Sequence, residues 1–402
     1  MDQKTESELL LYSLGIETAE ISATSLEKLS TDDWNQFIQQ SGKHSTIPLA
    51  YNNLKTTGMI AHIPTEIVQK LRKTYLYSAE RNIKLHNEFS KVIKILGDND
   101  IPVIALKGSA LAELVYQNIA LRPMTDVDVI AKTEDIWRMD KVLPQSGYKS
   151  DVENILLSKR HIEWARHIVF LNRFILFEVH PKIYELPDLD PWIKAVPAKI
   201  ASVDTFILGP EDFLLHLCVH LLEHFYVRGD IAKLIWWFDI REVIRQNREG
   251  LDWDYVVRIA RENQVEKAIN RVLHTINEYF NGNVPADILH QLGDDDIVIS
   301  INDILYGEQM QSQGNDSLLS YIPSISNMKS FRNRIYHIFR SVFPCKEYMI
   351  HRYSVKRANF VFLYYPVRMF KAFIRAVKTL FCLPSYLKHR HSSTSSSLKN
   401  IE

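Results

Sequence analysis

Apolar residues follow a helical period through the first hundred residues of the chain. After Pro64 they recur about every three to four positions, at Ile67, Leu71, Tyr75, Leu85, Phe89, Val92 and Leu96. Further upstream, Ser30 followed three residues later by Asp33 is the pattern of a capping box at a helix N-terminus. Residues 1–100 are therefore predicted to form an N-terminal helical region.

The period shifts to that of strands after the polar segment 97–100. Short apolar or alternating runs of strand type occur at residues 101–106, 126–131, 167–171 and 174–180, the last two joined as a hairpin at Asn172-Arg173. Helical patterns lie between them at residues 110–115 and 134–142. Residues 101–205 are predicted to form a small α/β core.

Helical patterning returns after this core. Pro210 with Glu211 and Asp212 beside it is typical of a helix N-terminus. We predict a helical domain over residues 206–305, a basic helical region over 318–388 and a disordered, Ser-rich tail over 389–402. The fold class is therefore α+β, with a small mixed sheet flanked by N-terminal and C-terminal helical regions.

Charge is distributed unevenly, although the 402-residue chain has 48 basic and 48 acidic residues. From Lys329 onward, the chain contains fifteen Lys and Arg residues but only two acidic residues. Residues 366–382 alternate an apolar stripe with a basic one, which fits either a helix docked on the acidic remainder of the chain or a helix lying on an anionic membrane. We favour docking. Nucleic acid is an unlikely partner, because no recognised binding motif accompanies these basic residues.

Three widely spaced cysteines, Cys218, Cys345 and Cys382, indicate neither a disulfide framework nor a thiolate metal site. The polar N-terminus is unlike a signal peptide, and the most apolar stretch, residues 358–367, is too short to span a bilayer. We expect a cytoplasmic protein, with peripheral contact at the inner membrane face as the alternative for the basic helix.

Candidate chemistry begins with Asp126 and Asp128. Residues two apart in a strand point to one face, which brings two carboxylates within about 6–7 Å at Cα. Such a pair repels unless a cation lies between them, and hard oxygen ligands suit Mg²⁺ or Mn²⁺. Glu178, the acid inside an otherwise apolar strand, is the candidate for a third carboxylate, and His180, which shares its face, is a candidate nucleotide-binding residue.

A phosphate-binding turn is predicted at Gly108-Ser109, where a strand passes into a helix. Gly allows close approach of the backbone, and a helix N-terminus offers free N–H groups to a phosphate. The Ser109 hydroxyl, Lys107 and Arg122 are candidates for the same phosphates. Taken singly, an Asp-x-Asp pair or a Gly-Ser turn is common, and it is their order along the chain that indicates an active site.

These segments carry a resemblance. The chain resembles the bacterial uncharacterised nucleotidyltransferase family, a branch of the DNA polymerase β-like superfamily. The likeness is carried by Leu106 to Ala112, Tyr116, Arg122, Thr125 to Val129 and Phe177 to His180. It extends over roughly residues 30–375. The resemblance implies a polymerase β-like core in which Gly108 and Ser109 hold a triphosphate. It also implies that Asp126, Asp128 and Glu178 hold the metal ions.

Two further groups of side chains have open interpretations. His216, His220 and His224 recur every four residues, a spacing that fits a structural face, a substrate contact or, least favoured, a metal site. Trp236, Trp237 and Phe238 are more typical of a helical core than of a base-stacking platform.

The predicted function is Mg²⁺- or Mn²⁺-dependent transfer of NMP from an NTP to a hydroxyl or phosphate acceptor, which releases pyrophosphate. The acceptor is a small molecule, a glycan precursor or a protein. The alternative is a non-catalytic descendant of this fold that binds a nucleotide or partner in a biosynthetic or toxin–antitoxin-like system. The intact acidic pair favours an enzyme, because a binding module has no need of two repelling carboxylates.

Overall fold

The computed structural model describes residues 3–16, 21–150, 167–228, 233–293, 298–306 and 362–366. The chain divides into two compact units, residues 1–311 and 312–402. The second unit contributes only the short described segment 362–366. The amphipathic helix predicted at 366–382 and the predicted tail at 389–402 therefore lie almost wholly outside the described residues.

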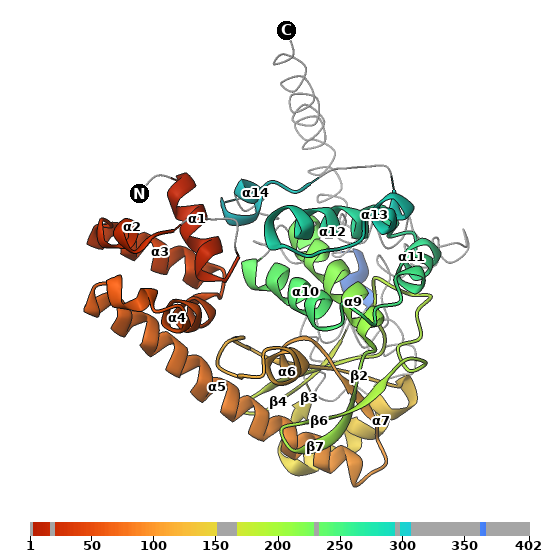
Figure 1. The fold of residues 1–402 in the computed structure, drawn as a ribbon. Coiled ribbons are helices and arrows are strands. Elements are labelled where there is room, and N and C mark those ends of the chain that lie inside the picture. The colour runs from red at the N-terminus through yellow and green to blue at the C-terminus, as the bar shows by residue number, and fades with distance from the viewer. Residues whose placement is uncertain are drawn as a thin grey trace. The chain divides into compact units, whose positions relative to one another are not determined.

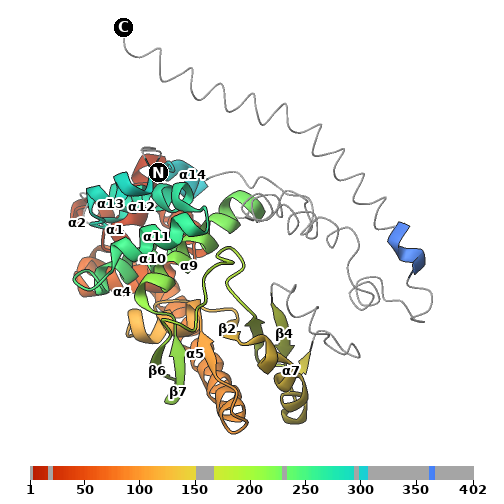
Figure 2. The same cartoon turned by 90° about the vertical axis from the view of Figure 1, so that its right-hand side faces the viewer.

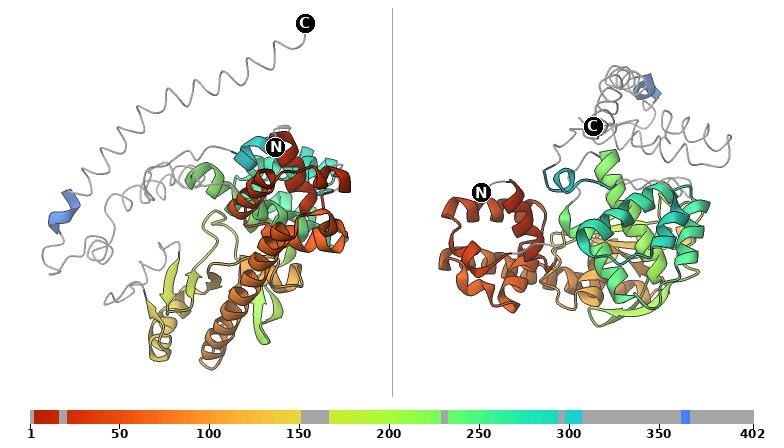
Figure 3. Two further views of the ribbon diagram at one scale, coloured as in Figure 1. Left: turned by 90° about the vertical axis from the view of Figure 1, so that its left-hand side faces the viewer. Right: turned by 45° about the horizontal axis from the view of Figure 1, so that its top comes forward.

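The N-terminal region is helical, as predicted. Its helices are α1 (Gln3–Ser13), α2 (Ala23–Glu27), α3 (Thr31–Lys43), α4 (Ile47–Thr56), the 3₁₀ turn η1 (Met59–His62) and α5 (Thr65–Gly97). Figure 3 shows the first four as a group of their own, in red and orange. The capping box is confirmed, because the Ser30 hydroxyl accepts from the Asp33 N–H and the Asp33 carboxylate accepts from the Ser30 N–H.

Helix α5 connects this group to the sheet and holds the segment that leads to the acidic pair (Figure 1). The Arg81 Nε donates to the Met124 carbonyl at 2.8 Å. The buried Asn82 side chain donates to the Arg122 carbonyl at 2.9 Å and accepts from the Met124 N–H at 3.2 Å. Residues 122–124 are thus fixed to a rigid helix immediately before Asp126.

A mixed sheet of seven strands forms the centre of the first unit. Its strands are β1 (Val103–Ala105), β2 (Val127–Ala131), β3 (Lys149–Ser150), β4 (Ile168–Leu171), β5 (Leu176–His180), β6 (Val196–Ile200) and β7 (Val203–Ile207). Their spatial order is β3-β4-β5-β2-β1-β7-β6. The predicted strands and the hairpin β4–β5 are present, which confirms the α+β class.

Three strands were not predicted from the sequence. The edge strand β6 is mostly exposed and contains Pro197, a residue that sheets tolerate mainly at edges. Strand β3 has only two residues. Strand β7 pairs antiparallel with the adjacent β6 and in parallel with β1, so its place in the sheet depends on one strand that is far away in the sequence.

Helices return after β7 and lie beyond one end of the strands (Figure 2). They are α9 (Pro210–Leu222), the π turn η4 (Glu223–Arg228), α10 (Leu234–Gln246), α11 (Trp253–Glu262), α12 (Glu266–Phe280), α13 (Ala286–Leu292) and α14 (Ile301–Tyr306). Helix α9 is apolar on almost every side because it packs against α10, α11 and α12. Helix α7 (Thr133–Val142) packs near α5 instead.

Among the described residues, no helix combines the length and the apolar character needed to cross a bilayer.

Candidate active site

The acidic residues predicted from the sequence come together on two adjacent strands. Asp128 lies in β2, and Asp126 immediately precedes that strand. Strand β5 runs parallel to β2, and Glu178 is the register partner of Asp128. Partners in a parallel ladder point to the same face of the sheet, so their carboxylates are neighbours. The sequence predicted this proximity correctly, and the catalytic role of Glu178 stays a prediction.

Asp128 receives two contacts on one oxygen. The Lys107 ammonium lies 3.0 Å from its Oδ1 and the His180 Nε2 lies 2.8 Å from the same atom. Lys107 has a φ of 45°, in the left-handed region that residues with a side chain seldom adopt. Such a conformation persists where the surroundings impose it, and here the ion pair with Asp128 is part of those surroundings.

The pKa values of Asp126 and Asp128 are shifted in opposite directions. Burial and the neighbouring Asp128 charge raise the pKa of Asp126. Burial would also raise the pKa of Asp128, but the Lys107 ammonium and the His180 hydrogen bond outweigh it and hold that pKa below its ordinary range. Asp128 is therefore ionised, whereas the ionised form of Asp126 is disfavoured by its surroundings.

This cluster fits a divalent cation. The three carboxylates of Asp126, Asp128 and Glu178 face a single ammonium, that of Lys107, which leaves an excess of negative charge in a partly desolvated place. Carboxylate oxygens are the ligands that Mg²⁺ and Mn²⁺ prefer. A cation between the acids would relieve the repulsion that raises the pKa of Asp126.

The Gly-Ser turn lies beside this cluster, at the start of the short helix α6 (Lys107–Ala110), which continues into the π turn η2 (Leu111–Val115). A side chain on Gly108 would meet the Arg122 Nη1 at 2.8 Å and the Met124 Cγ at 2.9 Å. The buried Ser109 hydroxyl donates to the Leu106 carbonyl at 3.0 Å. The predicted contact of this hydroxyl with a phosphate therefore requires that the hydrogen bond to Leu106 be broken.

Arg122 differs most from its predicted role. Its Nη2 lies 2.8 Å from the Asp239 Oδ2, and the Tyr116 hydroxyl donates to the Asp239 Oδ1 at 2.7 Å. All three side chains are largely buried, and Asp239 neutralises the guanidinium. Arg122 therefore does not supply the free positive charge expected for a phosphate, and it instead packs against Gly108. Its partner in α10 is 117 residues away, beyond what sequence spacing reveals.

His216 in α9 belongs to the surroundings of the cluster. Within the described part of the chain, neither of its ring nitrogens has a hydrogen-bond partner. Burial, together with the neighbouring Lys107 ammonium, lowers its pKa to about 3. The neutral imidazole thus retains one donor and one acceptor beside the predicted site, which favours the substrate contact among the alternatives for these histidines.

His220 and His224 lie further along the same helical segment and pack around one tryptophan. The ring centroids of His220 and His224 are 5.5 and 4.7 Å from that of Trp236. Trp237 and Phe238 are buried, and Trp237 stacks on Phe280 at 6.0 Å. The core interpretation is therefore correct for Trp237 and Phe238.

The mixed sheet, the Gly-Ser turn and the adjoining acids define a protein of the nucleotidyltransferase type. Residues 30–281 match the family described as "Uncharacterised nucleotidyltransferase", so the chain belongs to that family. No curated protein and no solved structure matches the chain.

We predict that Gly108→Ala strains the turn, because the added methyl group would meet Arg122 and Met124. Overpacking of this kind costs about 1–3 kcal/mol, which denaturant unfolding measures. Gly250→Ala is the matched control, since nothing lies within 4 Å of a Cβ at Gly250. Equal stability of the two variants would contradict the close approach of Arg122 to the turn.

We predict that Asp239→Asn destabilises the protein by about 3–5 kcal/mol, because it leaves the buried Arg122 guanidinium without a counter-charge. Tyr116→Phe is the control. It removes one hydrogen bond to Asp239 and keeps the ion pair, so its cost is about 1 kcal/mol. The urea midpoints of both variants test whether Asp239→Asn destabilises the protein more than Tyr116→Phe. A smaller effect of Asp239→Asn would contradict the prediction.

Proposed function

We propose that the chain transfers a nucleoside monophosphate from an NTP to a hydroxyl or phosphate acceptor and releases pyrophosphate. Its family supports nucleotidyl transfer in general. The observation that carries the proposal is the register of Asp128 against Glu178, with Asp126 beside them and the Gly-Ser turn adjoining. Three acids of this kind suit a divalent cation, Mg²⁺ or Mn²⁺, that binds a triphosphate.

Each residue of the cluster has a part in this reaction. The backbone of Gly108 and Ser109 holds the triphosphate, and Lys107 exchanges Asp128 for a phosphate oxygen as the substrate enters. Asp126, Asp128 and Glu178 would hold the cation, which stabilises charge on the attacking and leaving oxygens when bound.

The transfer step is an in-line displacement at the α-phosphorus. The acceptor oxygen bonds to the α-phosphorus, and the bond from that phosphorus to the oxygen bridging to the β-phosphate breaks. Glu178 accepts the proton of an acceptor hydroxyl, because the Asp128 carboxylate is already engaged by His180. His216 contributes a neutral hydrogen-bonding group to the substrate, which would satisfy its buried ring nitrogens.

A non-catalytic nucleotide- or partner-binding protein is the second candidate. The Lys107–Asp128 ion pair favours it, since an internal ammonium already compensates one of the acids without any bound ion. The excess of acids over Lys107 argues for the enzyme. The fate of the α-phosphate separates the two candidates.

We predict that, with Mg²⁺ and cell extract as the source of acceptor, label moves from α-labelled NTP onto a new product while γ-label appears in pyrophosphate. Asp128→Asn and Glu178→Gln should each lower this transfer by about 100- to 1000-fold, through loss of charge stabilisation. Asp204→Asn, at a side chain that is 91% exposed, is the matched control. Transfer by the Asp128 and Glu178 variants at the control rate would overturn the proposed site.

A further inference from the structure

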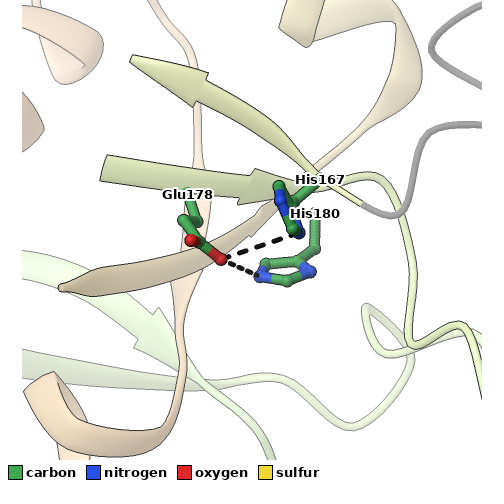
Figure 4. A group of neighbouring side chains, drawn as sticks. All are labelled: His167, Glu178 and His180. Atoms are coloured by element: carbon green, nitrogen blue, oxygen red, sulfur yellow. Dashed lines mark ion pairs between the residues drawn. The ribbon is translucent and has the colours of Figure 1, made fainter. Parts of the chain in front are cut away.

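Two imidazoles converge on Glu178 beside the acidic cluster. His167 immediately precedes β4, and Glu178 and His180 lie in the neighbouring strand β5 (Figure 4). The His167 Nδ1 is 3.6 Å and the His180 Nε2 is 3.9 Å from the Glu178 Oε2. All three ligand atoms lie within 4.8 Å of one another.

These separations are too long for direct hydrogen bonds between the imidazoles and Glu178, which require about 2.7–3.2 Å for N–H···O. They are instead close to the spacing of ligands around one ion. Atoms bound to a common metal at about 2.1 Å lie about 3–4 Å apart, so only small side-chain rotations are needed here. The rings of His167 and His180 lie 5.6 Å apart between their centroids and are inclined at 69° to one another.

We propose that His167, Glu178 and His180 bind a divalent transition-metal ion, Zn²⁺ in preference to Mg²⁺. Two neutral imidazoles and one carboxylate form a donor set that suits zinc and leaves a fourth position open, whereas Mg²⁺ prefers oxygen ligands and water. Asp128 adjoins the site, because its Oδ1 is 2.8 Å from the His180 Nε2, and an ion bound to this nitrogen would replace that hydrogen bond. This site adjoins the proposed active site, and the proposal rests on the proposed function in that respect alone. Binding of the ion requires neither NTP nor acceptor.

The site is accessible to an ion from solvent. The His167 side chain is 36% exposed, whereas those of Glu178 and His180 are 18% and 17% exposed. Glu178 and His180 are thus mostly buried in their strand, and the more exposed His167 lies on the solvent side of the site. His167 also differs from Glu178 and His180 in having no predicted part in the active site, so its removal tests this site separately from the acidic pair.

The test uses the full-length chain, stripped with a chelator and titrated with Co²⁺ alone as a spectroscopic stand-in for Zn²⁺. We expect visible absorption typical of four- or five-coordinate Co²⁺, abolished by one equivalent of Zn²⁺ and unchanged by a large excess of Mg²⁺. His167→Gln should weaken Zn²⁺ binding, measured by calorimetry, by about tenfold or more. His62→Gln is the matched control, because His62 is 37% exposed and also pairs with a glutamate, Glu27, at 2.8 Å.

Three outcomes would overturn the proposal: displacement of Co²⁺ by Mg²⁺, equal Zn²⁺ affinity of the His167 and His62 variants, or no Zn²⁺ binding by the wild type. Circular dichroism of each variant verifies its fold. A second measurement does not depend on any variant, since pulsed electron paramagnetic resonance of bound Cu²⁺ detects coupled imidazole nitrogens directly. Loss of Zn²⁺ binding alone leaves the proposed transfer reaction standing, because that reaction is measured with Mg²⁺ and labelled NTP.

Discussion

The repulsion between carboxylates held side by side on β2 and β5 is the constraint on which the rest of the site depends. The parallel register of Asp128 and Glu178 is set by the backbone ladder, so the side chains cannot separate without breaking the sheet. Lys107 neutralises part of this charge and adopts an uncommon backbone conformation beside it. Burial and the Asp128 charge raise the pKa of Asp126 in spite of Lys107.

The remaining structure supports the acids from two sides. Helix α5 binds the backbone of residues 122–124 through Arg81 and Asn82 and so places Asp126 at the start of its strand. Asp239 in α10 fixes the Arg122 guanidinium against Gly108. The helices after residue 206 thus contribute to the Gly-Ser turn through one buried ion pair, and α9 brings the neutral His216 to the same region.

Local pattern was sufficient to predict much of this arrangement. Period and capping identified α3 and α5, and alternation identified β2, with Asp128 in the strand and Asp126 immediately before it. Pairing across long distances was not predictable. The Arg122–Asp239 pair spans 117 residues, and the internal hydrogen bond of Ser109 depends on the turn geometry around Leu106. The hairpin β4–β5 was predicted, but the register that brings His167 next to Glu178 was not.

The most direct test of the central claim measures how Mg²⁺ and a nucleotide affect each other's binding. An NTP analogue with a non-cleavable bridge between its α- and β-phosphates is titrated into the chain with and without Mg²⁺. If the acids need a cation, Mg²⁺ should tighten analogue binding by about 5- to 150-fold in the wild type and leave it unchanged in the Asp126→Asn, Asp128→Asn double variant. Binding that is equally tight without Mg²⁺, or a metal response that survives in the double variant, would contradict the account.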